Sequence, residues 1–242
     1  MKIEAVLFDL DDTLLGNRME SFLPSYFPLL SAYLKDFISP DVLIQELMIG
    51  TQAMIQNVVG DRTNSDIFWD VFCRRTGLDR QQFEPKVTRF YREEFGLLRG
   101  LTQTKPAARK ILEYCFHQQL KVVIATNPVF PMSAIQQRLS WAGIPVDIYD
   151  YSIVTAYENM HSSKPHVAYY EEILDIIDVP PFKSVMVGDN WENDMVPAAT
   201  LGLRTYWITN DQQVDPEKIS LVGEHGTLDT LLDLLSSGWL EN

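Results

Sequence analysis

The chain has 242 residues, 46% of them hydrophobic and 22% charged, which is ordinary globular composition at a length that suits one large domain or a core with an inserted subdomain. Its 33 acidic and 20 basic residues give a net charge of −13, so we expect no binding to nucleic acid and none to anionic membranes. No run approaches the ~20 apolar residues of a membrane span.

Two further features bear on the compartment. The first residues hold one lysine, a short apolar run and then acids, which does not match a signal peptide. Cys73 and Cys115 lie far apart without a Cys-x-x-Cys pattern, so we expect reduced core cysteines. Both features favour a cytoplasmic location.

The first predicted element is a buried strand over residues 5–8, which are all apolar. Asp9 and Asp11 follow it, two positions apart, and in extended backbone their side chains point the same way. Two carboxylates ~4 Å apart repel by ~1 kcal/mol in water and several times more in a drier site. A cation, a proton or wide exposure to solvent must offset this repulsion.

The next predicted elements are helices, because residues 19–95 contain amphipathic segments and no β-branched apolar run. Breaks at Ser39-Pro40, Gly60-Asp61 and 77–79 separate the segments. We expect about four helices, at residues 22–37, 40–59, 65–76 and 80–95. Such a block is too long for a loop between strands, so we interpret it as an insertion with its own small core.

From residue 97 onward, predicted strands and helices alternate. The strands lie at residues 121–125, 151–154, 184–187 and 203–208, and the helices at 105–118, 132–142, 165–177, 193–201 and 227–235. Alternation of this kind indicates βαβ units and a mostly parallel sheet. Strands that are apolar throughout indicate helices on both faces. The fold class we predict is therefore α/β.

Functional groups follow three of the apolar strands: Asp9 after the first, Thr126 after the second and Asp189 after residue 188. Ligands of open parallel sheets bind beyond the carboxyl ends of the strands. Lys164, before Pro165, stands at the start of a predicted helix. A hydroxyl, a lysine and several acids at one edge suit a phosphoryl group held with a divalent cation.

In these residues the chain resembles the haloacid dehalogenase-like (HAD) hydrolases along its whole length. The family's four motifs occur in order, as Asp-Leu-Asp-Asp-Thr-Leu at 9–14, Thr126-Asn127, Lys164, and Gly-Asp-Asn-Trp-Glu-Asn-Asp at 188–194. The resemblance implies a Rossmann-like, three-layer parallel-sheet core at residues 1–17 and 97–242, and a helical cap of the C1 type at 18–96.

The resemblance also implies catalytic roles. Asp9 would be the nucleophile that forms an aspartyl-phosphate. Asp11 would protonate the leaving oxygen and then activate the hydrolytic water. Thr126, Asn127 and Lys164 would bind the phosphoryl group, and Thr126 and Lys164 count among the catalytic residues.

The cofactor implied by the resemblance is Mg²⁺. Its site would consist of the Asp9 and Asp189 carboxylates and the Asp11 backbone carbonyl, with Asp194 orienting a metal-bound water. The implied substrate is a small phosphorylated metabolite, processed by a monomer or homodimer.

Alternatives remain at this stage. Within the family, relatives that cleave carbon–halogen bonds lack an acid at the position of Asp11, so Asp11 favours phosphate-ester hydrolysis over a 2-haloacid dehalogenase. A phosphomutase shares all four motifs. A non-catalytic binding or regulatory protein on the same scaffold is the alternative of a different class. Taken singly, Thr126 also fits a turn-capping residue and Lys164 a solvated lysine.

Overall fold

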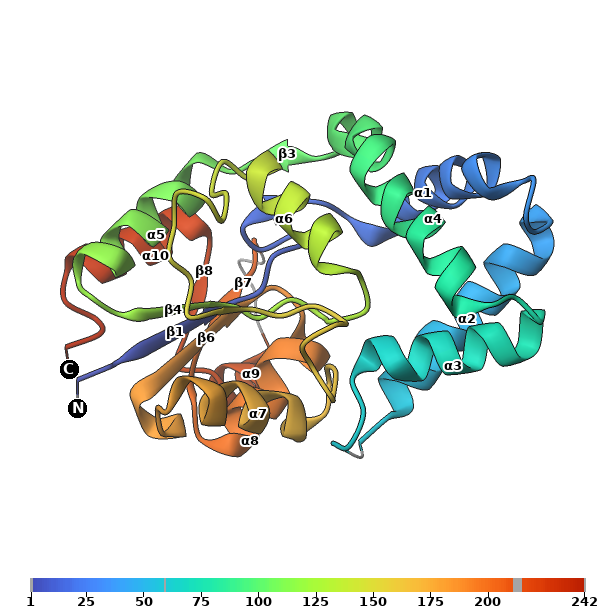
Figure 1. Ribbon diagram of the computed structural model, residues 1–242. Coiled ribbons are helices and arrows are strands. Elements are labelled where there is room, and N and C mark those ends of the chain that lie inside the picture. Colours follow the sequence, from blue (N-terminus) through green and yellow to red (C-terminus); the bar gives the residue numbers. More distant parts are fainter. Residues whose placement is uncertain (1, 59, 211–214, 242) are drawn as a thin grey trace.

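The computed structural model describes residues 2–58, 60–210 and 215–241, and its centre is a parallel β-sheet (Figure 1). Within this part of the chain the sheet has six strands in the order β5-β4-β1-β6-β7-β8. Their bounds are β1 Ala5–Phe8, β4 Lys121–Ile124, β5 Ile153–Val154, β6 Ser184–Gly188, β7 Arg204–Ile208 and β8 Glu224–Gly226. The expected α/β class and parallel sheet are confirmed, and the short edge strand β8 is an addition.

The sheet has helices on both faces, which gives three layers. Ala5 and Leu7 of β1 pack into one apolar cluster, whereas Val6 and Phe8 pack into another on the opposite face. Helices α5, α6 and α10 lie on one face, and α7, α8 and α9 lie on the other (Figure 1). Their bounds are α5 Pro106–His117, α6 Met132–Trp141, α7 Val167–Ile177, α8 Val196–Leu201, α9 Pro216–Leu221 and α10 Leu228–Ser236.

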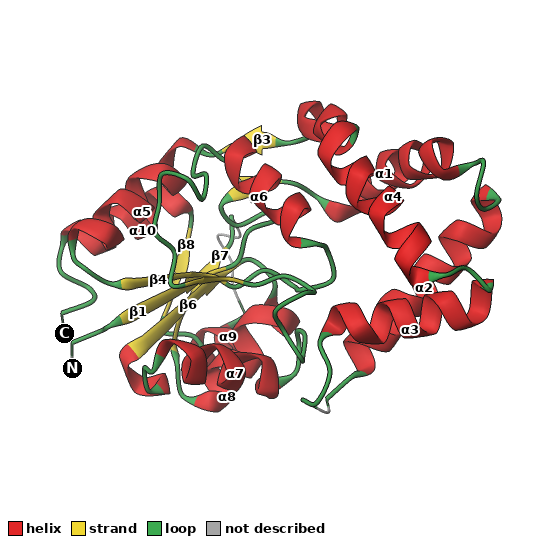
Figure 2. Ribbon diagram, in the orientation of Figure 1, coloured by secondary structure: helices red, strands yellow, loops and turns green. Residues whose placement is uncertain are grey.

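The helices of the inserted segment lie beside this sandwich (Figure 2). They are α1 Met19–Leu34, α2 Pro40–Gln56, α3 Asn64–Thr76 and α4 Arg80–Glu93, followed by a 3₁₀-helix at Phe95–Leu101. The Thr63 and Asp79 side chains cap α3 and α4 by accepting backbone N–H bonds. Gly77, at a φ of 74°, ends α3 in the left-handed conformation that glycine adopts at little cost.

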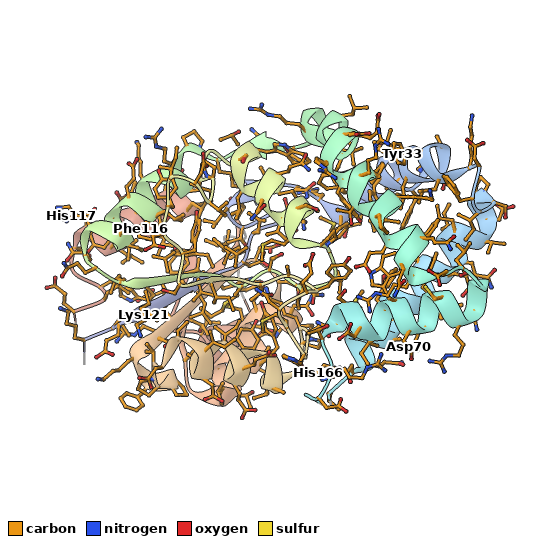
Figure 3. All side chains as sticks on the ribbon, viewed as in Figure 1. Tyr33, Asp70, Phe116, His117, Lys121 and His166 are labelled. Carbon is orange, nitrogen blue, oxygen red and sulfur yellow. The ribbon has the colours of Figure 1, made fainter. Side chains whose placement is uncertain are left out.

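The two crossings between the sheet and these helices pair with each other. Strand β2, Leu15–Gly16, leads out and strand β3, Gln103–Thr104, leads back, and they form an antiparallel pair that the sequence did not predict. A second junction lies at His166 (Figure 3). The His166 Nε2 atom is 2.7 Å from the Ile55 carbonyl oxygen of α2. Both junctions hold the inserted helices against the sandwich.

The carboxyl ends of β1, β4 and β6 define the edge of the sheet that matters here. Because β1 lies between β4 and β6, the residues that follow these three strands are neighbours. The chain runs outward from β1 to β4 and β5 on one side and resumes with β6 on the other, so this edge is a topological switch point. None of the described helices is long and apolar enough to cross a membrane.

Candidate active site

A pocket of about 250 Å³ opens at this edge, and every residue that the motifs predicted for the site lies in its wall. Those residues are Asp9, Asp11, Thr126, Asn127, Lys164, Asp189 and Asp194. They come from the loops after β1, β4 and β6 and from the segment before α7. The fold therefore brings together groups that are up to 185 positions apart in sequence, from Asp9 to Asp194.

Lys164 is the buried cation of the pocket, with 2% of its surface exposed. Its Nζ donates to Asp9 Oδ1 at 2.8 Å and to Asp194 Oδ1 at 2.6 Å. Burial disfavours the charged lysine, but the Asp194 and Asp9 carboxylates outweigh it and hold the Lys164 pKa well above its usual value. A solvated surface lysine, the alternative for this residue, is excluded by this geometry.

Asp9, Asp189 and Asp194 form a cluster of carboxylates, with one oxygen of each lying within 4.8 Å of the others. Burial raises the pKa of Asp189 to about 7, and the charges of Asp9 and Asp194 add to this effect. Burial also raises the pKa of Asp194 to about 6, although Lys164 opposes it. Crowded carboxylates that resist ionisation together are a donor set suited to a hard divalent cation.

The turn after β6 positions Asp194. The chain forms a π-helical turn at Trp191–Met195, where the sequence predicted an α-helix from residue 193. The Asn190 backbone N–H donates to Asp194 Oδ2 at 3.0 Å, while Lys164 binds the other oxygen. Gly188 is required beside it, because a Cβ at that position would collide with the Asp194 carboxylate. Asp194 is thus held at both oxygens, which suits a residue that orients its neighbours.

The Asp11 carboxylate has partners of its own outside this cluster. Its Oδ1 accepts a 2.6 Å hydrogen bond from Asn17 Nδ2, and its Oδ2 is ion-paired with Arg138 Nη1. Burial raises the pKa of Asp11, Arg138 opposes that effect, and Asp9 adds to it. The structure therefore gives Asp9 and Asp11 different partners, which allows different protonation states.

Arg138, in α6, is a site residue that the sequence analysis missed. Its side chain is 1% exposed, and the guanidinium lies over the Phe130 ring, 4.7 Å from the centroid. A signal was available, because Ile135, Arg138 and Leu139 share the buried face of an amphipathic helix. An arginine on such a face requires a partner, and Asp11 is that partner.

Thr126 and Asn127 form the wall after β4. Thr126 is 2% exposed, and its carbonyl oxygen accepts hydrogen bonds from Thr155 Oγ1 at 2.7 Å and Tyr169 Oη at 2.8 Å. These bonds fix the backbone that carries the Thr126 hydroxyl. Thr13 Oγ1 also donates to Asp189 Oδ1 at 3.2 Å, which joins the loops after β1 and β6.

The charges around the pocket are unbalanced. Its wall contains six acidic side chains and two basic ones, Lys164 and Arg138, among the described residues. A bare phosphate dianion would therefore meet net repulsion. A bound divalent cation inverts this local field, so the donor set and the charge imbalance both fit a metal ion that is held together with an anionic substrate.

Comparison with known proteins agrees with this geometry. The chain matches the family model described as haloacid dehalogenase-like hydrolase over residues 3–202. It is 25% identical to pyrophosphatase PpaX of Bacillus cereus over 85% of this chain and 82% of that protein. It is also 28% identical to haloacid dehalogenase-like hydrolase domain-containing protein 3 of Xenopus laevis, over 43% of this chain and 40% of that protein.

Among solved structures, the HAD phosphatase of Thermococcus onnurineus is similar at a TM-score of 0.59 and 22% identity, over 96% of this chain and 98% of that one. At this identity the likeness shows a shared fold. The family match, over more than half of the chain, shows the relationship itself. This protein belongs to the haloacid dehalogenase-like hydrolases and is an enzyme of that family.

Proposed function

We propose that the protein is a Mg²⁺-dependent phosphatase that hydrolyses a small phosphate monoester through an aspartyl-phosphate at Asp9. The observation that carries the proposal is the double ion pair of buried Lys164 with Asp9 and Asp194. A buried lysine so placed neutralises the nucleophile and a phosphoryl group beside it. The intact set of reactive groups therefore favours an enzyme over a binding or regulatory protein.

In the proposed reaction, an Asp9 carboxylate oxygen attacks phosphorus, and the bond from phosphorus to the alcohol oxygen breaks. Asp11 gives its proton to that leaving oxygen. Water then attacks phosphorus, Asp11 takes a proton from it, and the bond between Asp9 and phosphorus breaks to release inorganic phosphate. The raised pKa of Asp11 fits its first role, since an acid catalyst must be protonated at the start.

Mg²⁺ fits the carboxylate cluster and would be held by the Asp9 and Asp189 carboxylates and the Asp11 backbone carbonyl. When bound, the ion supplies positive charge that offsets the acids and the phosphoryl oxygens. Asp194, held by Lys164 and Asn190, would orient a metal-bound water. Thr126 would donate its hydroxyl to a phosphoryl oxygen.

We further propose that residues 1–17 and 97–242 act as the catalytic core, and 18–96 as a cap that selects the substrate. The chain leaves the core directly after the loop of Asp9 and returns through the β2–β3 pair, which supports this division. Residues of the cap, such as Met19, already contribute to the wall of the pocket. A cytoplasmic location and a monomeric or homodimeric state stay predictions.

The test is phosphate release from an aryl phosphate with and without Mg²⁺, for the wild type, Asp9→Asn and the control Asp36→Asn. Asp36 is exposed and lies outside the pocket. We expect Mg²⁺-dependent release that Asp9→Asn abolishes and Asp36→Asn retains. Activity that survives in Asp9→Asn would exclude the nucleophile. Halide release from 2-haloacids would indicate a dehalogenase, and isomerised sugar phosphate without free phosphate would indicate a phosphomutase.

A further inference from the structure

A second cavity, of about 240 Å³, lies next to the catalytic pocket among the inserted helices. Met19, Val129 and Phe130 line both spaces. These three side chains therefore form a partition between the cavity and the catalytic pocket. Phe130 also supports the guanidinium of Arg138, so the partition is in direct contact with the polar site.

The walls of this cavity are apolar and largely aromatic. None of the described residues that line it carries a charge. Two of its few polar groups satisfy each other, since the hydroxyls of Tyr26 and Tyr91 lie 2.6 Å apart and are buried. Burial raises the pKa of Tyr26 to about 12 and that of Tyr91 well above its usual value, so both stay neutral. Apart from the buried Trp69 indole N–H, which has no hydrogen-bond partner among the described residues, the cavity thus has little to offer a charged or hydroxyl-rich guest.

The volume sets the size of the guest. An engineered apolar cavity of about 150 Å³ stays dry and binds benzene. The present cavity, at about 240 Å³, is larger and has room for an aromatic ring or for an alkyl chain of about six carbons. Because Phe130 lines both spaces, the alcohol part of an ester bound in the pocket would enter the cavity beside this side chain.

We propose that the substrate is the phosphate monoester of an uncharged, apolar alcohol, whose alkyl or aryl part fills the cavity. This inference rests on the proposed phosphatase activity and adds the class of alcohol. A sugar or another polyol in the same space would leave hydroxyl groups without partners, which is costly in a dry environment. An apolar group gains by leaving water.

The test is a homologous series of straight-chain alkyl phosphates from ethyl to hexyl, with glucose 6-phosphate as the polar comparison. Burial of one methylene is worth about fourfold in binding. We expect kcat/KM for Mg²⁺-dependent phosphate release to rise about fourfold per carbon and, for hexyl phosphate, to exceed that for glucose 6-phosphate.

Two variants connect this gain to the cavity. Leu23→Trp on α1 and Thr51→Phe on α2 both enlarge side chains that line it, and each should flatten the dependence on chain length. Having two variants covers the case in which one does not fold. Leu97→Trp is the matched control, because Leu97 is 69% exposed and lies outside both spaces, and it should retain the wild-type slope.

The possible results distinguish this inference from the proposed phosphatase activity on which it rests. A flat series, or a preference for glucose 6-phosphate over hexyl phosphate, would overturn the apolar substrate class while the phosphatase activity stands. A slope that is unchanged in folded Leu23→Trp and Thr51→Phe would overturn the cavity as its origin. Failure of every ester, aryl phosphate included, to release phosphate with Mg²⁺ would overturn the proposed function and this inference together.

Discussion

Replacement of Lys164 by methionine tests the electrostatics of the site most severely. Methionine keeps much of the length of the side chain but removes the charge that pairs with Asp9 and Asp194. The metal-free variant then holds a cluster of buried carboxylates without their cation. Removal of one partner from a buried ion pair typically costs about 3–5 kcal/mol, because the remaining charge is uncompensated.

For a chain of this size, 1 kcal/mol shifts Tm by about 2–4 °C, so we expect Tm of the metal-free variant to fall by about 6–20 °C at about pH 8. The loss should shrink at about pH 5, because carboxylates that cannot be paired take up protons instead. Mg²⁺ should recover part of the loss at about pH 8 by binding the folded state. Phosphate release should fall by about 10²–10³-fold even with Mg²⁺.

The assay is thermal unfolding at both pH values, with and without Mg²⁺, together with phosphate release. Lys183→Met is the matched control, because Lys183 makes a single 2.7 Å ion pair with Glu4, and the two side chains are 33% and 47% exposed. Such a pair is worth about 0–1 kcal/mol, so Tm of the control should change by at most a few degrees. Equal effects of the two substitutions, or a loss in Lys164→Met that is independent of pH, would refute the reasoning.

Three further predictions follow from the same geometry. Arg138→Met should lower kcat/KM about tenfold or more and move the pH profile to higher pH, because it removes the cation that lowers the Asp11 pKa. Arg138→Lys should restore part of the lost kcat/KM. A pH profile that does not move in Arg138→Met would contradict this pairing. Burial raises the pKa of Asp189 to about 7 and of Asp194 to about 6, so these two carboxyl groups bind more protons in the folded, metal-free protein than in the unfolded chain. The Tm of the wild type relative to that of Asp189→Asn should therefore fall as pH rises from about 4 to about 7, and Mg²⁺ should reverse the fall. A rise of this Tm difference over the same range would contradict the sign. Gly188→Ala should lower the free energy of unfolding by about 1–3 kcal/mol and weaken Mg²⁺ binding, because its Cβ displaces the Asp194 carboxylate. Denaturant unfolding measures the first effect and calorimetry the second. Wild-type values for both would show that the turn accommodates a methyl group.

Much of the fold could be predicted because its signals are local. The apolar run before Asp9 predicted β1, and the run before Thr126 predicted β4, each to within one residue of its end. Polar groups directly after such strands come to the same edge of the sheet, since parallel strands end at one edge. Thr126 and Asp189 could therefore be predicted as site residues from the predicted parallel sheet. Lys164, which follows no strand of the sheet directly, required the resemblance to the family.

Other features depend on packing, which no local pattern encodes. The β2–β3 pair has strands of two residues, too short for an alternating pattern. The Arg138–Asp11 pair joins positions 127 residues apart and emerges only when α6 packs over the loop after β1. The apolar cavity is a space left between helices, and its aromatic walls looked like ordinary core in the sequence.

The central claim is that Asp9 becomes covalently phosphorylated during turnover. The most direct measurement is mass spectrometry of the enzyme quenched in acid during turnover of an aryl phosphate with Mg²⁺, followed by analysis of the peptide that contains Asp9. We predict a phosphoryl group on Asp9 that is absent without Mg²⁺ and absent from Asp9→Asn. Sustained phosphate release with the phosphoryl group on another residue would contradict the claim.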